Sequence, residues 1–120
     1  MARILIVDDS PTQTFNLTKM LKKHGHEIFT AENGEEGVDE AQAKLPDLIL
    51  MDVVMPKLNG FQATRKITHN KLTQHIPVIL VTTKDQETDR VWGQRQGAKG
   101  YIVKPADESS LIELVDSLLP

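Results

Sequence analysis

The chain has 120 residues, a formal net charge of −3 at pH 7 and no cysteine, which suits a single domain with one hydrophobic core and no disulfide cross-link. It carries no secretory signal, and no apolar run approaches the ~20 residues of a membrane-spanning helix, so we expect a cytoplasmic protein without membrane insertion. The mild net charge and the lack of a basic block along the sequence argue against nucleic acid as a partner.

The hydrophobic pattern predicts five strands that alternate with five helices. In chain order they are strand 3–7, helix 11–24, strand 27–31, helix 34–44, strand 48–51, helix 61–70, strand 78–81, helix 86–96, strand 100–103 and helix 108–119. This alternation is typical of an α/β fold with a doubly wound parallel sheet and helices on both faces. No internal repeat, linker or low-complexity segment interrupts it, so we expect residues 1–120 to form one domain.

Capping and turn residues mark several of the predicted helix boundaries. Ser10 is a good helix cap, and Pro11 suits the first helical position because its missing N–H is not needed there. Gly25 is expected to end this first helix. Asp85 is expected to cap the fourth helix, in which Val91 faces inward.

The run at residues 48–51 organises the rest of the prediction. Four apolar residues in succession predict a strand that is buried on both faces, as in the middle of a parallel sheet. Asp52 follows directly, at the carboxyl end of this strand. In open α/β sheets that edge is where ligands bind.

Charged and hydroxyl residues also follow the other predicted strands, namely Asp8, Asp9, Thr82 and Lys104. Each of them taken alone is an ordinary residue for its position, since an acidic pair suits a helix N-terminus and a lysine beside proline suits a solvated loop. Parallel strands, however, bring their carboxyl ends to one edge of the sheet. Together with Asp52, these residues therefore predict one polar site.

The predicted site has a chemistry of its own. Three neighbouring carboxylates repel one another, and a divalent cation such as Mg²⁺, which prefers oxygen ligands and commonly binds carboxylates together with a phosphate, resolves this. The Thr82 hydroxyl can donate to one phosphoryl oxygen, and the Lys104 ammonium can neutralise another. Asp52 lies between these groups, so we expect it to act as a nucleophile that forms an acyl phosphate.

Several short motifs occur in order along the chain. They are Ile4-Leu5-Ile6-Val7-Asp8-Asp9, Leu50-Met51-Asp52 with Met55-Pro56 and Gly60, Pro77-Val78-Ile79 through Thr82, Gly97-Ala98, and Tyr101 with Lys104-Pro105. Each motif alone is weak, but the whole set at these spacings is specific. By these motifs the chain resembles, over its full length, the receiver domain of two-component response regulators. The resemblance implies the flavodoxin-like strand order 2-1-3-4-5.

The resemblance also implies the roles of individual residues at the site. Asp52 would accept a phosphoryl group from a histidine kinase. Mg²⁺ would be the cofactor, bound by Asp9, Asp52 and the carbonyl of Val54, with Asp8 contributing through water. Such a protein is not an enzyme with small-molecule turnover, because it catalyses only its own phosphorylation and dephosphorylation.

A switch pair, Thr82 and Tyr101, is implied as well. Its rearrangement would remodel the face formed by the fourth helix, the fifth strand and the fifth helix, where a downstream partner binds. Trp92 in the fourth helix is either a core residue or an exposed anchor for that partner, since tryptophan is enriched at binding hot spots. The sequence leaves both interpretations of Trp92 open.

The chain stops after the predicted last helix, which predicts a stand-alone regulator without an output domain, as in chemotaxis, and a monomer or weak dimer. Residues 59–65 and 85–93 look closest to the small regulators of twitching motility by type IV pili. The downstream partner would then be a motility or signalling protein. A phosphate sink or a phosphorelay intermediate is the alternative role within the same class.

Two functions from other classes are less favoured. A small Mg²⁺-dependent aspartyl phosphatase needs a second aspartate two residues after the nucleophile, where this chain has Val54. A flavin or nucleotide carrier on the same fold needs a phosphate-binding loop rich in Gly, Ser or Thr after the first strand. Asp8 and Asp9 occupy that place and would repel a phosphate in the absence of a metal ion.

Overall fold

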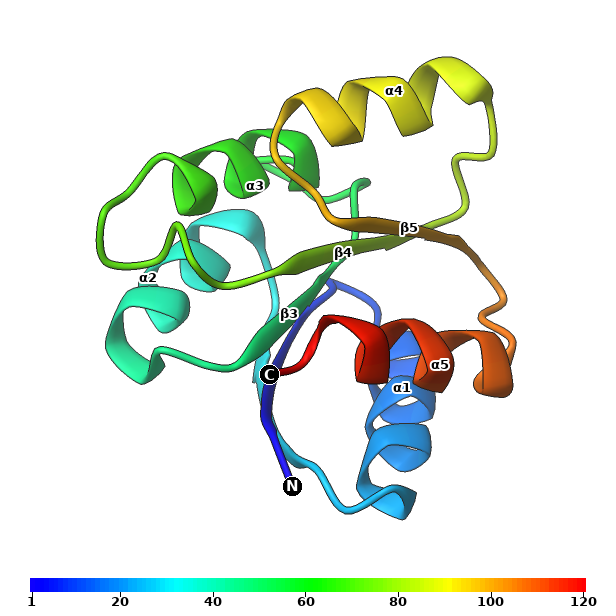
Figure 1. The fold of residues 1–120 in the computed structure, drawn as a ribbon. Helices are drawn as coiled ribbons and strands as arrows, with labels where there is room; N and C mark the ends of the chain where they lie inside the picture. The colour runs from blue at the N-terminus through cyan, green and yellow to red at the C-terminus, as the bar shows by residue number, and fades with distance from the viewer.

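The computed structural model describes residues Met1–Pro120 and contains five strands that alternate with five helices (Figure 1). In chain order the elements are β1 (Arg3–Val7), α1 (Pro11–Lys23), β2 (Glu27–Ala31), α2 (Gly34–Lys44), β3 (Leu48–Met51), α3 (Gly60–Thr68), β4 (Val78–Thr82), α4 (Glu87–Arg95), β5 (Gly100–Val103) and α5 (Glu108–Leu118). The predicted fold class is confirmed, and the predicted boundaries agree with these to within two residues. None of the helices is both long and apolar enough to cross a membrane.

The sheet is parallel throughout, with the strand order β2-β1-β3-β4-β5. This is the order that the resemblance implied. β3 lies at the centre, between β1 and β4, which explains why all of its residues are buried. Because the strands run in one direction, the carboxyl ends of β1, β3 and β4 are adjacent along one edge of the sheet.

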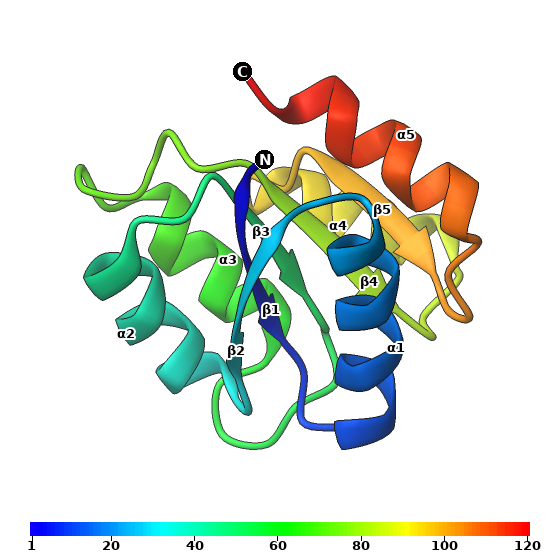
Figure 2. The same cartoon turned by 90° about the horizontal axis from the view of Figure 1, so that it is seen from below.

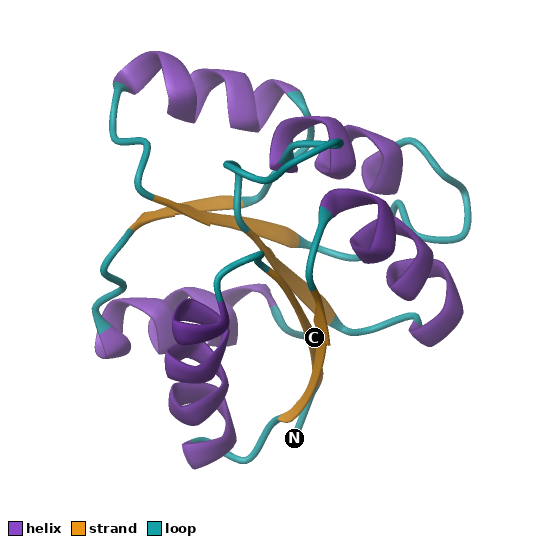
Figure 3. Cartoon of the chain, turned by 180° about the vertical axis from the view of Figure 1, so that it is seen from behind, coloured by secondary structure: helices purple, strands orange, loops and turns teal.

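Helices cover both faces of the sheet (Figures 2 and 3). One buried cluster lies between the sheet and helices α2 and α3, and the other between the sheet and helices α1 and α5. Successive residues of β1 alternate between them, since Leu5 and Val7 belong to the first cluster and Ile4 and Ile6 to the second. Helix α4 packs beside β5 on the first face, where Gly93 is its only buried residue.

Side-chain caps fix the starts of two helices next to the predicted site. Ser10 Oγ accepts a hydrogen bond from the Gln13 N–H at 3.3 Å, as predicted for a helix that begins at Pro11. At the start of α3, Asn59 and Gln62 each accept from the backbone N–H of the other, both at 2.9 Å. These caps hold the chain where it leaves β1 and where the loop after β3 ends.

Two predictions for the fourth helix are wrong. The N-cap is Gln86 and not Asp85, because the Asp89 carboxylate reaches back to accept from the Gln86 N–H at 3.3 Å. Val91 is 41% exposed and does not face inward. The helix instead approaches the sheet through Gly93, where a Cβ atom would meet side chains of the core, and this close approach turns Val91 toward solvent.

Two fully buried threonines provide a test of the packing. Thr73 Oγ1 donates to the Ile67 carbonyl at 2.7 Å, whereas the Thr64 hydroxyl has no hydrogen-bond partner. Valine has the same shape without the hydroxyl. We expect Thr64→Val to raise the free energy of unfolding by about 1 kcal/mol, and Thr73→Val to lower it by a similar amount. Urea unfolding measures both changes, and changes of the same sign would contradict this account.

Candidate functional site

Three carboxylates meet at the carboxyl-terminal edge of the sheet. Asp8 and Asp9 follow β1, and Asp52 follows the neighbouring β3. One carboxylate oxygen from each lies within 4.8 Å of the others. Asp8 and Asp52 are buried, with 4% and 7% of their surface exposed, whereas Asp9 is exposed. The structure therefore brings together the acidic trio that the sequence placed at this edge.

Lys104 joins two of these carboxylates. Its Nζ lies 2.7 Å from Asp8 Oδ2 and 3.6 Å from Asp52 Oδ2. The Lys104 N–H donates to the Thr82 carbonyl at 2.8 Å, which fixes the side chain's starting point beside β4. Because the side chain is only 7% exposed, little water screens its attraction to the carboxylates.

The three carboxylates differ in how many hydrogen bonds and ion pairs they form within the protein. Asp8 is paired on both oxygens, since Oδ2 faces Lys104 and Oδ1 accepts from the Ser10 N–H at 2.9 Å. Asp9 has no hydrogen bond or ion pair within the protein. This leaves Asp9 and Asp52 as the carboxylates with capacity for a cation. The second bond to Asp8 comes from a backbone group, which has no signal in the sequence.

The electrostatic environment of Asp52 disfavours its charged form. Burial raises the pKa of Asp52 above its usual value, and the nearby charge of Asp8 raises it further. Lys104 opposes this shift, as do hydrogen bonds from the backbone N–H groups of Val53 and Val54. Burial is the largest of these causes. Asp52 is therefore a carboxylate whose charge the protein compensates only in part, as is common at functional sites.

The loop after Asp52 packs closely against the backbone of that residue. The Gly60 N–H donates to the Val53 carbonyl at 2.9 Å, and a Cβ atom at Gly60 would overlap the Asp52 carbonyl oxygen. Glycine is thus required there by the close backbone contact and not by a positive φ angle, and the sequence did not reveal this contact. Val54 is 56% exposed, and its carbonyl accepts no hydrogen bond within the protein, so that oxygen is open to a ligand.

Thr82 and Tyr101 are linked through the backbone of one residue. The Lys84 N–H lies 3.4 Å from Thr82 Oγ1, and the Tyr101 hydroxyl donates to the Lys84 carbonyl at 2.7 Å. Thr82 is buried at the end of β4, but its hydroxyl makes no hydrogen bond to the carboxylates. The structure therefore connects the two expected switch residues without joining Thr82 to the acidic trio. Lys84 was not selected from the sequence, because its contribution is made by main-chain atoms.

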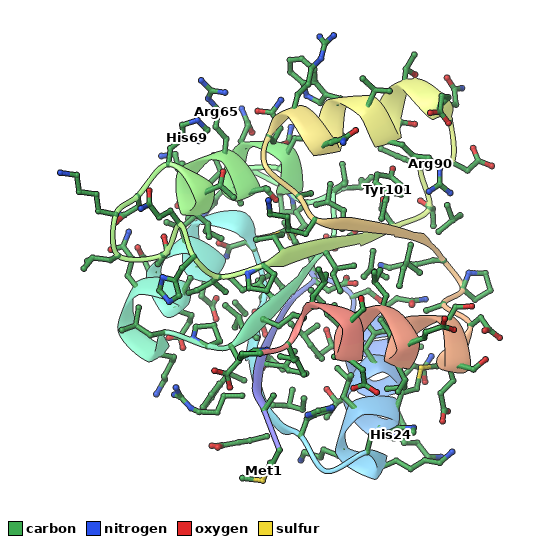
Figure 4. All side chains as sticks on the ribbon, viewed as in Figure 1. Met1, His24, Arg65, His69, Arg90 and Tyr101 are labelled. Carbon is green, nitrogen blue, oxygen red and sulfur yellow. The ribbon has the colours of Figure 1, made fainter.

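The surroundings of Tyr101 lie on the face shared by α4 and β5. Arg90 stacks over the Tyr101 ring at 5.0 Å from guanidinium carbon to ring centroid (Figure 4). Burial raises the pKa of Tyr101, the charges of Asp89 and Asp85 add to the rise, and Arg90 opposes it, so the hydroxyl stays protonated and able to donate. Trp92 on the same helix is 50% exposed, which shows that it is a surface residue and not part of the core.

Comparison with known proteins points to one family. The family model of the response regulator receiver domain matches residues 4–116. Protein PilH of Pseudomonas aeruginosa is 60% identical to this chain over 119 residues, which cover 99% of this chain and 98% of PilH. Several other curated relatives are longer, such as the response regulators PleD of Caulobacter vibrioides and ArlR of Staphylococcus aureus, of whose lengths the chain spans 26% and 53%.

Solved structures share the fold over nearly the whole chain. The chemotaxis protein CheY4 of Vibrio cholerae is 30% identical with a TM-score of 0.92, and the match covers 99% of both chains. The receiver domain of the sensor histidine kinase PA1611 from Pseudomonas aeruginosa is 28% identical with a TM-score of 0.90, covering 98% of this chain and 96% of that one. In that crystal structure a magnesium ion is coordinated in the active site cleft.

The raised pKa of Asp52 has a consequence for stability. A carboxyl group whose pKa is raised by folding binds its proton more tightly in the folded state, so stability falls as pH rises from the ordinary aspartate pKa through the folded value. Asp52→Asn removes this charge while Lys104 keeps its 2.7 Å ion pair with Asp8. In EDTA we expect urea unfolding to show the variant more stable than the parent at pH 7 by about 1 kcal/mol, with a smaller difference at pH 4.

Asp107→Asn is a control with the opposite sign. Hydrogen bonds from Ser110 and Ser109 lower the pKa of Asp107, the exposed N-cap of α5. Its ionised form therefore adds stability above its ordinary pKa, and this stability is lost as pH falls through the folded value. Asp107→Asn should therefore lower the free energy of unfolding at pH 7. If Asp52→Asn lowered stability there as well, a destabilising charge at Asp52 would be ruled out.

Proposed function

The chain belongs to the family of response regulator receiver domains of two-component systems, and on this basis we propose that it is a phospho-accepting switch with Asp52 as the acceptor. A histidine kinase supplies the phosphoryl group, and phosphorylation changes the affinity of the protein for a partner. The observation that carries the proposal is the position of Lys104 Nζ, 2.7 Å from Asp8 and 3.6 Å from Asp52. A cation already lies beside the carboxylate that would receive an anionic group.

In the proposed reaction, a carboxylate oxygen of Asp52 attacks the phosphorus atom of a phosphohistidine. The O–P bond forms as the N–P bond breaks, and the donor imidazole leaves with the bonding electron pair. Lys104 then pairs with one phosphoryl oxygen, and the Thr82 hydroxyl donates to another. Hydrolysis resets the switch: water attacks the phosphorus atom, the bond between the Asp52 oxygen and phosphorus breaks, and inorganic phosphate leaves while the Asp52 carboxylate is restored.

The donor set fits Mg²⁺. Three carboxylates have oxygens within 4.8 Å of one another, and the Val54 carbonyl has no partner within the protein. All of these are oxygen ligands, which Mg²⁺ prefers. Asp9, Asp52 and the Val54 carbonyl would hold the ion, and Asp8 would contribute through water. When bound, the ion supplies positive charge that neutralises the phosphoryl group during transfer.

The proposed signal leaves the site through the Lys84 backbone. In the phosphorylated protein the Thr82 hydroxyl turns toward the phosphoryl group and no longer accepts from the Lys84 N–H, which is 3.4 Å away in this structure. The loop after β4 then shifts, and Tyr101 loses the Lys84 carbonyl as its acceptor. The face that changes is formed by α4, β5 and α5, where the half-exposed Trp92 would contact a partner.

The proposed biological role is control of type IV pilus motility in the cytoplasm. Residues 59–65 and 85–93 led to this assignment, and the 60% identity to PilH over nearly all of both chains supports it. A phosphate sink and a phosphorelay intermediate are the alternatives, since they use the same chemistry. An aspartyl phosphatase is disfavoured because the exposed Val54 stands where that chemistry needs an acid/base aspartate.

Phosphorylation can be tested with a small-molecule donor. With Mg²⁺ and acetyl phosphate, the mass of the intact chain should increase by one phosphoryl group. Asp52→Asn should abolish this labelling, and Lys104→Met should slow it roughly 100-fold because a donor to the transferring group is lost. Asp116→Asn, a remote and exposed aspartate on α5, should label like the parent. Equal labelling of Asp52→Asn and the parent would refute the assignment.

Binding of Mg²⁺ can be tested by thermal unfolding. Excess Mg²⁺ should raise the midpoint by roughly 3–8 °C over EDTA, because the ion binds the folded state and relieves repulsion among the carboxylates. Asp9→Asn removes an unpaired ligand and should lose most of this increase. Asp116→Asn should retain it. A parent midpoint that is the same in EDTA and in excess Mg²⁺ would count against the metal site.

A further inference from the structure

The charges of this chain are segregated. Residues 53–84 contain five of the fourteen Lys and Arg residues and none of the seventeen Asp and Glu residues. The chain as a whole is acidic, but the segment that includes α3, β4 and their flanking loops is basic. These basic residues form no block in the sequence, and only the fold shows that two of them, Lys66 and Lys71, lie near the later Arg95 and Lys99.

Two hollows collect basic side chains around the C-terminal ends of α3 and α4. One, of about 460 Å³, lies between these helix ends and the start of β4, and the other, of about 650 Å³, lies between α2 and α3. His69 lines both, so the hollows adjoin, and no carboxylate lines either of them. Six basic or titratable residues line the two hollows, and we call them the basic surface: Lys66, His69, Lys71, His75, Arg95 and Lys99.

The basic surface lies at the opposite end of the sheet from the acidic site. His75 precedes β4 and Lys99 precedes β5, whereas Asp52 follows β3. Since β4 spans five residues, the two ends of the sheet are roughly 15 Å apart. Figure 4 shows His69 and its neighbour Arg65 projecting outward from α3, away from the sheet. A ligand on this surface would not touch the phosphorylation site.

Helix dipoles account for only part of this arrangement. Lys66 and Arg95 lie in the last turns of α3 and α4, where basic residues are stabilised by the helix C-terminus. Lys71 and Lys99 lie in loops, where that explanation does not apply. None of the six residues forms an ion pair with a carboxylate, although other lysines of the chain do. Unpaired like charges repel one another, so their gathering points to an anionic ligand.

We propose that the basic surface binds an acidic segment, rich in Asp and Glu, of a protein partner. The surface extends from the groove between α2 and α3 to the end of α4, which suits an extended chain with several carboxylates. The Arg95 guanidinium can donate two parallel hydrogen bonds to one carboxylate, and Leu118 and Pro77 offer apolar contact beside it. No Phe, Tyr or Trp lines either hollow, whereas single-stranded nucleic acid stacks its bases mainly on such side chains.

The test measures binding of a dye-labelled hexaglutamate peptide to the full chain at low salt by fluorescence anisotropy. The double variant Arg95→Gln with Lys99→Gln should weaken binding about tenfold, because it removes two charges at the centre of the surface. The matched control, Lys19→Gln with Lys22→Gln on the exposed side of α1, removes the same charge and should change binding less than about twofold. Circular dichroism checks that both variants fold.

Two further measurements separate the possible outcomes. The ratio of the peptide dissociation constants of the two double variants should be the same in an Asp52→Asn background, because the proposed binding does not depend on phosphorylation. Trp92 lies three residues before Arg95 on α4, and its fluorescence should change on adding the peptide to the parent but not to the Arg95→Gln, Lys99→Gln variant.

The proposal is overturned by absence of hexaglutamate binding to the parent, or by equal weakening in both double variants. It is also overturned if a single-stranded DNA oligonucleotide, or vesicles of phosphatidylglycerol and phosphatidylcholine, bind the parent more tightly than the peptide does. Either result would identify a different class of partner.

Discussion

The Lys104 ammonium between Asp8 and Asp52 is the interaction on which the site depends. Removing a carboxylate from water costs several kcal/mol unless it is paired, and two carboxylates are buried here at the ends of adjacent strands. One ammonium from a third strand makes this arrangement possible, at 2.7 Å from one and 3.6 Å from the other. Burial raises the pKa of Asp52, and the Lys104 ammonium offsets this rise only in part, so the environment of Asp52 favours any ligand or covalent change that compensates its charge.

Main-chain atoms connect this site to its surroundings. The Ser10 N–H completes the pairing of Asp8, the backbone of Gly60 lies against the carbonyl of Asp52, and the Lys84 peptide unit contacts the hydroxyls of both Thr82 and Tyr101. Each contact depends on the path of the backbone. The residues that supply these backbone groups can therefore have other side chains, except at Gly60, where there is no room for one. The fold also places the acidic site at one end of the sheet and the basic surface at the other. The two proposed ligands, a phosphoryl group and an acidic peptide segment, would therefore bind at different places without competing.

Local patterns predicted most of the fold because its elements are defined by local chemistry. Apolar runs, capping residues and glycines lie next to the boundaries that they determine, and the boundaries were predicted to within two residues. The failures are confined to α4. Asp85 is a good cap by type, but the Asp89 carboxylate placed the helix start one residue later. Val91 has an apolar side chain, yet the close approach of Gly93 to the sheet decided which side of the helix is buried.

The sequence by itself determined the order of the elements and the residues that stand at the strand ends, including Asp52 and Lys104. This was possible because parallel strands always present their carboxyl ends at one edge. Only the tertiary structure decided that Lys104 lies nearer to Asp8 than to Asp52, that Trp92 is half exposed, and that six dispersed basic residues gather around two hollows. Those outcomes depend on distances between segments that are remote along the chain, and a local pattern of residues does not encode such distances.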